Sequence, residues 1–330
     1  MKQSTAAMQG LFSLDEGITE VLGLRIQEYL VVDEAIELAR ASDMSTGWGE
    51  NGLSIQVLPE PLLLPSTFSD IKTKWKSEHP NEVSNRKTCL YRYGTGSTTR
   101  DVLSLSLKET EWEEVQPVHA ELSGRRGSDL RALILKPLLA DRAAQFPNIL
   151  TVHGILETSD NAVVLAQRSS KVRYHPLCWS ASFEEQIEPQ DVVNPTSSSI
   201  HRASVRGVSE EFVAGHRLSP SICKVLALIV EFGIINPAAV VYIRIPFSQQ
   251  ELLRARQDVT SSLDEFEQGR IAFVPLDIEQ LAHFAIAQYC RLSNSSRGLW
   301  HPTSRYRILI AMLHNFGEEE TLRALEKAIG

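Results

Sequence analysis

The chain has 330 residues, of which 43% are hydrophobic and 22% are charged, and its formal net charge is −8. This length predicts two domains, or one domain with extensions, around a core of ordinary size. The acidic balance argues against general binding to nucleic acid or to anionic membranes. No apolar run approaches the roughly 18 residues that a transmembrane helix needs, so no membrane span is expected.

The four cysteines are scattered along the chain and form no Cys-x-x-Cys pair. This spacing predicts neither a zinc site nor a disulfide framework. Buried free thiols are expected instead, and these are typical of proteins in the reducing cytosol. The first residues, MKQSTAAMQGLFSLDEG, contain no long apolar segment, so no secretory signal is expected. The protein is therefore predicted to be cytoplasmic.

The first part of the chain, residues 1–146, is predicted to form an α+β module. Apolar residues recur at helical spacing from residue 14 to residue 42, which predicts a long helix there. A short helix is expected at residues 69–77. Alternating apolar residues and turn signals predict three strands, at residues 53–58, 87–94 and 101–107.

The second part, residues 147–330, is predicted to be a separate unit that ends in helices. Residues 148–167 form a strand-like run, and the β-branched residues in 237–246 predict a further strand. Residues 222–230 fit either a buried strand or a buried helix. Amphipathic helices are expected at residues 278–292 and 305–329.

Residues 200–215, IHRASVRGVSEEFVAG, predict an amphipathic helix. At about 100° per residue its apolar residues share one stripe, and Gly207, Glu210 and Glu211 lie near one another on a different face. Two adjacent carboxylates repel each other. This face is therefore either an ordinary solvated surface or a place where a divalent cation such as Mg²⁺ is bound by oxygen ligands.

This helix carries the pattern R-x-V-x-E-E-F from Arg206 to Phe212, which resembles the core of the Nudix box, G-x5-E-x7-R-E-U-x-E-E-x-G-U. Upstream, Glu185 and Asp191 keep the spacing of the first glycine and glutamate of the box. Downstream, residues 264–281 resemble the late Nudix segment, in which a glutamate precedes a strand that ends in Val-Pro-Leu. The resemblance covers about residues 147–284. Residues 91–112 also loosely resemble the N-terminal extension of long Nudix proteins that act on UDP-sugars.

The resemblance implies an α/β fold, namely a Nudix-like α/β/α sandwich with a mixed sheet, an α+β N-terminal extension and C-terminal helices. It also implies an activity. Nudix enzymes hydrolyse a nucleoside diphosphate linked to another group, and the resemblance of residues 91–112 points to a nucleotide sugar as one such compound. Mg²⁺ or Mn²⁺ neutralises the diphosphate and positions a water molecule, which a glutamate can deprotonate.

The resemblance also implies roles for individual residues. Glu210 and Glu211 correspond to metal ligands, and Glu211 is in addition a candidate catalytic glutamate. Glu265 or Glu267 would fill the late catalytic position, although a solvated charged loop explains this segment equally well. Arg206 would be structural, holding the loop of the box through a carboxylate.

The sequence departs from the box at several positions. Gly207 stands where active members have a glutamate that binds metal, and glycine cannot take that role. The loop between Asp191 and Arg206 is also longer than the box allows. An incomplete metal site is therefore expected, unless Glu184, Glu185 or Asp191 supplies a substitute ligand. The alternative function is a Nudix-like module that binds a nucleotide without cleaving it and signals to a protein partner or a second copy.

A basic run, Arg168, Lys171 and Arg173, precedes the box. Guanidinium and ammonium groups bind a diphosphate well, which makes these residues candidates for contacting the ligand. The alternative is a solvated hairpin end that binds nothing. His175 follows this run, but no closely spaced histidine pair predicts a histidine metal site.

Overall fold

The computed structural model describes residues 29–96, 101–123, 127–213, 223–260, 268–290, 292 and 298–330. The larger of the two sheets in these residues contains the strands β1 (Val31–Val32), β2 (Ala35–Arg40), β6 (Thr151–Glu157), β7 (Ala162–Arg168), β8 (Trp179–Ser180), β9 (Phe183–Gln186), β10 (Cys223–Glu231), β11 (Asn236–Arg244) and β12 (Gln268–Pro275). Its order is β1-β2-β10-β11-β6-β7-β12, with β8 beside β7 and β9 beside β6. The pairing of β11 with β6 is parallel and the other pairings are antiparallel, so the sheet is mixed.

Both faces of this sheet are buried. Successive side chains of a strand point to opposite faces, and in β10 Leu228 and Val230 join one apolar cluster while Ala227 and Ile229 join another. A strand that is covered on both sides needs apolar residues at every position. This explains why β10 and β11 contain nearly continuous apolar runs.

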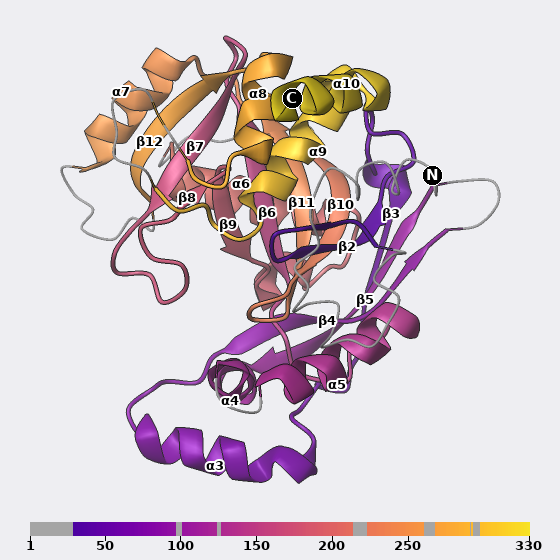
Figure 1. Cartoon of the computed structure of the whole chain (residues 1–330). Coiled ribbons are helices and arrows are strands. Elements are labelled where there is room, and N and C mark those ends of the chain that lie inside the picture. The colour runs from indigo at the N-terminus through magenta and orange to yellow at the C-terminus, as the bar shows by residue number, and fades with distance from the viewer. Residues whose placement is uncertain are drawn as a thin grey trace.

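Helices cover the two faces. The helix that carries the box resemblance, α6 (Ser198–Glu211), contributes to one apolar cluster, and α8 (Ile278–Ile286), α9 (Ser304–Phe316) and α10 (Glu318–Ile329) contribute to the other. Figure 1 shows these last three helices gathered at the top of the molecule. A further helix, α7 (Gln249–Thr260), lies between β11 and β12 in the chain. The result is an α/β fold with a mixed sheet, which is compatible with a Nudix-like sandwich.

Residues 53–140, called the N-terminal module from here on, contain a second and smaller sheet, formed by β3 (Leu53–Val57), β4 (Arg86–Thr95) and β5 (Leu103–Glu111) in the order β3-β5-β4, whereas β1 and β2 belong to the larger sheet. Its helices are α3 (Ser69–Glu78), α4 (Trp112–Leu122) and α5 (Gly127–Ala140), which lie at the bottom of Figure 1. The three strands predicted for this module and its short helix are thus confirmed. The amide of Asn148 ties the module to the larger sheet, because it accepts from the main-chain nitrogen of Leu90 at 3.0 Å and donates to the oxygen of Leu90 at 2.9 Å.

The helix predicted for residues 14–42 is wrong where the structure describes this segment. Residues 14–28 lie outside the described residues, whereas residues 31–40 form the hairpin β1–β2, with Asp33 in its turn at φ 50°. Every residue of β2 is buried, and β2 pairs with β10. A strand that is covered on both faces has apolar residues at most positions, and some of these positions also fit helical spacing. The apolar pattern therefore did not distinguish a strand from a helix here.

The helix predicted for residues 305–329 is in fact two helices. Gly317 separates α9 from α10 and has φ 79° and ψ 174°, a conformation that is essentially restricted to glycine. The ambiguous residues 222–230 belong to the strand β10. In the described part of the chain no helix is long and apolar enough to cross a membrane.

Candidate functional site

A cavity of about 960 Å³ lies between the N-terminal module and the larger sheet. Residues of β4, α4, β6, β9 and α6 line it, together with the loop after β7 and the turn between β10 and β11. Its volume is at the upper end of the ~300–1,000 Å³ typical of small-molecule sites. Several residues considered in the sequence line it, namely Arg168, Lys171, Arg173, His175, Glu185, Arg206, Glu210 and Glu211.

Arg206 binds the two carboxylates upstream of the helix. Its guanidinium lies 2.8 Å from an oxygen of Glu185 on β9 and 2.9 Å from an oxygen of Asp191 in the short helix η4 (Pro189–Val192). It also donates to the main-chain oxygen of Gln186 at 2.7 Å. Burial works against a raised pKa, but Asp191 and Glu185 outweigh it and raise the pKa of Arg206. Glu185 and Asp191 are therefore already paired with a cation of the protein itself.

Gly207 faces a buried aromatic ring. Phe183 is fully buried, and a β-carbon added at Gly207 would stand 2.7 Å from its ring and 3.0 Å from the β-carbon of Glu185. A β-carbon added at Gly154 of β6 would overlap the same ring from the other side. Phe183 thus fills the space between two glycines, and position 207 has no room for a longer side chain.

Glu210 and Glu211 both line the cavity, but they are neighbours on α6 and leave the helix about 100° apart. The side chain of Glu210 is 58% exposed, and its carboxylate lies 3.6 Å from Arg206. Among the described residues, the box carboxylates do not come together as a group of three ligands within 4.8 Å of one another. Mg²⁺ is often bound through one or two carboxylates plus water and phosphate. This pair therefore fits such an ion only if a ligand supplies the remaining oxygens.

The basic run differs from residue to residue. Arg168, at the end of β7, is buried and forms an ion pair with Glu184. Arg173 binds Glu82 at 2.7 Å, and its guanidinium lies 5.0 Å from the centre of the Trp75 ring. Lys171 and Arg173 line the cavity, as does Arg168. Arg168 and Arg173 thus already have carboxylate partners within the protein.

Lys87 brings a further cation from the N-terminal module to the same cavity. The residue is 7% exposed, and its ammonium lies 5.4 Å from the centre of the Trp112 ring. Within the described residues no carboxylate forms an ion pair with it. Burial lowers the pKa of Lys87, and the more distant Glu188 and Glu185 offset this effect only in part. A buried charge without a bonded counter-ion destabilises a fold unless something compensates it.

Glu184 on β9 is the centre of a buried ionic network. It forms ion pairs with Arg168 and with the fully buried Arg307 of α9, and it accepts from the hydroxyl of Ser180. Burial opposes ionisation, but interactions with His301 and with the guanidiniums of Arg307 and Arg168 hold the pKa of Glu184 well below its usual value. One ionised carboxylate therefore binds two guanidinium groups.

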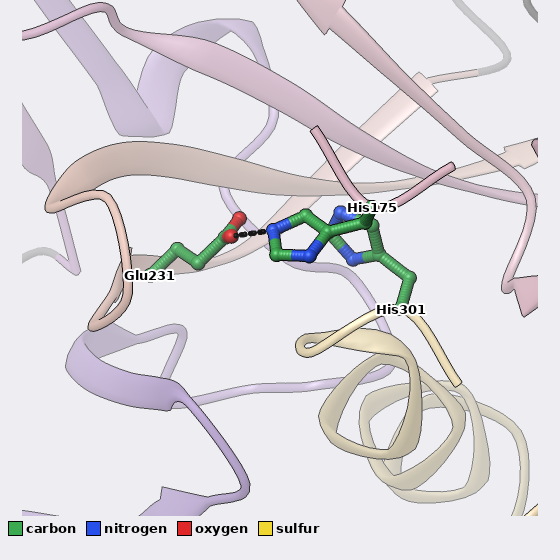
Figure 2. Close-up of side chains that lie close together, drawn as sticks. All are labelled: His175, Glu231 and His301. Carbon is green, nitrogen blue, oxygen red and sulfur yellow. Dashed lines mark hydrogen bonds and ion pairs between the residues drawn. The ribbon is translucent and has the colours of Figure 1, made fainter. Parts of the chain in front are cut away.

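Three side chains from distant parts of the chain meet beside this network (Figure 2). His175 lies in the loop after β7, Glu231 ends β10, and His301 precedes α9. The Nε2 of His175 lies 2.7 Å from a carboxylate oxygen of Glu231, and the rings of His175 and His301 have their centres 4.9 Å apart. Within the described residues, this is the group in which three possible metal ligands lie within 4.8 Å of one another. All three residues line the cavity.

Glu265 and Glu267 lie outside the described residues, so their catalytic role stays a prediction. No sequence pattern singles out Lys87, Glu231 or His301, and His175 stands in the sequence as a lone histidine. No local pattern marks these residues, because each contacts its neighbours only after distant elements have packed.

No protein-family model and no curated protein matches the sequence. Thirty chains of solved structures match the structure. One is DR0079 from Deinococcus radiodurans, with 13% identity and a TM-score of 0.30 over 48% of this chain and 80% of that one. Another is Tm1382, described as "a putative Nudix hydrolase", with 12% identity and a TM-score of 0.32 over 70% of this chain and 99% of that one. TM-scores this low assign neither a fold family nor a function to this chain.

Proposed function

We propose that this protein binds a nucleoside-diphosphate derivative, such as a nucleotide sugar, in the cavity between the N-terminal module and the larger sheet. The observation that carries the proposal is Lys87, a buried ammonium that lines the cavity without a carboxylate partner among the described residues. An anionic ligand would compensate this charge. Hydrogen bonds between charged groups are about twice as strong as neutral ones, and phosphate oxygens accept them well.

The surroundings of Lys87 suit the other parts of such a ligand. Trp112 stands beside the ammonium and offers an aromatic face on which a base can stack. Lys171 and Arg173 add positive charge on the same cavity wall. The volume of about 960 Å³ accommodates a nucleotide together with a second group.

Binding without cleavage agrees best with the helix that carries the box pattern. Arg206 pairs with Glu185 and Asp191, and Phe183 fills the space beside Gly207. The carboxylate of Glu210 also lies 3.6 Å from Arg206. We therefore rank a binding or sensor module, which would signal to a protein partner, ahead of an enzyme.

Hydrolysis is the second candidate, and one observation favours it: Glu210 and Glu211 both line the cavity that would hold the diphosphate. In that case Mg²⁺ or Mn²⁺ would bind between these carboxylates and the phosphate oxygens of the ligand. Product release that requires Mg²⁺ and disappears in Glu211→Gln would favour hydrolysis over binding alone.

Calorimetric titration of the full chain with ADP, UDP, ADP-ribose and UDP-glucose tests the proposal. We expect at least one of these compounds to bind saturably at micromolar to low millimolar concentration. Lys87→Met keeps the length of the side chain and removes its charge, so it should weaken that binding by at least about tenfold, which corresponds to one charge-assisted hydrogen bond.

Lys136→Met is the matched control, because Lys136 is exposed on α5 and does not line the cavity. It should bind the same compound as tightly as the unchanged protein does. The proposal fails if none of the four compounds binds at millimolar concentration. It also fails if Lys87→Met, with its fold intact by circular dichroism, binds with unchanged affinity.

A further inference from the structure

We infer that His175, Glu231 and His301 form a binding site for a divalent transition-metal ion, for which Zn²⁺ is the reference probe. Two imidazoles and one carboxylate are a donor set that suits zinc and related ions, whereas Mg²⁺ prefers oxygen ligands alone. This site is separate from the carboxylates of α6. It also does not depend on the proposed nucleotide ligand, since the ion can be tested by itself.

The distances between the three side chains are close to those a metal ion needs. Ligand atoms around a tetrahedral zinc ion lie about 3.4 Å apart, given zinc–nitrogen bonds of about 2.0–2.1 Å. Here one donor atom of each residue lies within 4.8 Å of the other two, and the pair His175–Glu231 is 2.7 Å apart. Small side-chain rotations that open this hydrogen bond and draw in His301 would give the required spacing.

Rigid elements hold two of the three ligands. Glu231 ends β10 and His301 precedes α9, and each is 2% exposed. The guanidinium of Arg307 and the main-chain nitrogen of Thr303 donate to the Nδ1 of His301 at 3.2 and 3.4 Å, so this nitrogen is an acceptor and a metal ion at Nε2 would displace the proton there. The third ligand, His175, comes from a loop and can adjust.

The backbone around His175 is held in an uncommon conformation. His175 has φ 50° and Leu177 has φ 63°, both in the left-handed region that non-glycine residues rarely adopt. Main-chain hydrogen bonds fix this turn, since Leu177 donates to Arg168 at 3.2 Å and Cys178 donates to His175 at 3.4 Å. Such strain persists where the surrounding structure enforces it, and here it directs the imidazole toward Glu231.

The local charges favour a cation at this point. The two nearest guanidiniums, Arg168 and Arg307, both pair with Glu184. Glu231 forms its ion pair within the described residues with His175, whose side chain is 23% exposed.

The ion would have three protein ligands and a free position toward the cavity, because all three residues line it. Zinc sites with three protein ligands and one open position bind water or a ligand oxygen. Under the proposed function, that position would take a phosphate oxygen. This last step rests on the proposed function, whereas binding of the ion does not.

Titration of the untagged full chain with Zn²⁺ and with Co²⁺, after dialysis against a chelator, tests the site. We expect one equivalent of Zn²⁺ to bind, and Co²⁺ to give the visible absorption of a nitrogen- and oxygen-ligated site. His175→Gln and Glu231→Gln should each weaken Zn²⁺ binding by at least about 100-fold, more than the 10–100-fold typical of residues that only orient ligands.

Two control variants locate the ion. His283→Gln removes an exposed histidine of α8, and Glu210→Gln removes a carboxylate of α6 from the same cavity. Both should bind Zn²⁺ as the unchanged chain does. Absence of saturable binding overturns the inference, as does binding that survives His175→Gln or is lost in Glu210→Gln. If Glu231→Gln fails to fold, His175→Gln decides alone, because its side chain is partly exposed and lies in a loop. Neither result bears on whether the nucleotides bind.

Discussion

Phe183 shows how a single side chain can set the properties of a whole site. Its ring lies between Gly154 of β6 and Gly207 of α6, and both glycines leave room for it. The helix can approach the sheet closely because neither position carries a side chain. Gly207, which interrupts the box pattern, thus removes a carboxylate from the site and also makes room for the Phe183 ring.

The packing predicts the effect of the smallest substitution at this position. Gly207→Ala gains up to about 1 kcal/mol of helix propensity, but its β-carbon would stand 2.7 Å from the Phe183 ring. Overpacking of a core costs about 1–3 kcal/mol. We therefore expect a net decrease in the free energy of unfolding, measured by urea denaturation.

A double-mutant cycle separates the two contributions. In a Phe183→Leu background the ring is gone, so Gly207→Ala should become neutral or stabilising. If Gly207→Ala stabilises the protein equally in both backgrounds, the close contact does not control this position.

Arg173 and Lys87 illustrate what the sequence can reveal about individual site residues. Arg173 was singled out because it belongs to a visible basic run, and the structure places it on the cavity wall. Lys87 has no such signal, because its importance comes from burial and from Trp112, which follows on another element. A local pattern identifies charge, but it does not show whether the charge has a partner.

At the level of elements, the strands with one patterned face could be predicted and β2 could not. In β3 buried and exposed residues alternate, whereas every residue of β2 is buried. Alternation depends on one face remaining polar, and it disappears when both faces are covered. The sequence also does not predict that His175, Glu231 and His301 lie close together. They come from the loop after β7, the end of β10 and the segment before α9, which are far apart in the chain.

The break between α9 and α10 predicts how a substitution at Gly317 changes stability. Gly317 has φ 79° and ψ 174°, and a β-carbon added there would meet no atom within 4 Å. Gly317→Ala should therefore lower the free energy of unfolding by about 1–3 kcal/mol through backbone strain alone. Thermal or urea denaturation measures this change.

Gly49→Ala is the control for this experiment. A β-carbon at Gly49 also meets nothing within 4 Å, but Gly49 has φ −74°, which any residue adopts. Its substitution should be close to neutral. Equal effects of the two substitutions would show that the conformation at Gly317 carries no strain for alanine.

At the scale of the whole molecule, a buried histidine joins the N-terminal module to the loop that bears His175. The Nδ1 of His119 on α4 lies 2.9 Å from the hydroxyl of Tyr174, which donates in turn to Gln116 at 2.9 Å. Burial, with a smaller contribution from the charge of Arg173, lowers the pKa of His119 to about 4. The folded protein therefore keeps this imidazole neutral in mildly acidic solution.

This pKa predicts how stability depends on pH. Between pH 6.5 and about pH 4 the unfolded chain takes up a proton at His119 that the folded protein does not. The stability associated with the neutral imidazole is present above pH 6.5 and is lost as the pH falls through this range. The slope reaches at most about 1.4 kcal/mol per pH unit for one proton.

Comparison with His119→Gln isolates this residue. The amide keeps a donor near Tyr174 and does not titrate, so the free energy of unfolding of the variant should fall less steeply between pH 6.5 and pH 4. The variant will keep some slope, because burial also lowers the pKa of His153, to about 3. Parallel pH profiles of the two proteins would contradict the assignment.

The pairing of β2 with β10 has a consequence for the order of events on the ribosome. Arg40 pairs with Ala227 and Ala35 with Glu231, so the partners are separated by 187 and 196 residues (227 − 40 and 231 − 35). At translation rates of about 5–20 residues per second, the hairpin β1–β2 leaves the exit tunnel roughly 10–40 s before its partner strand exists. During that interval a strand that is mostly apolar, with Glu37 and Arg40 as its charged residues, has an unpaired edge, which is a template for aggregation. Nascent chains of this protein therefore have a defined period in which a chaperone that shields this hairpin would raise the yield.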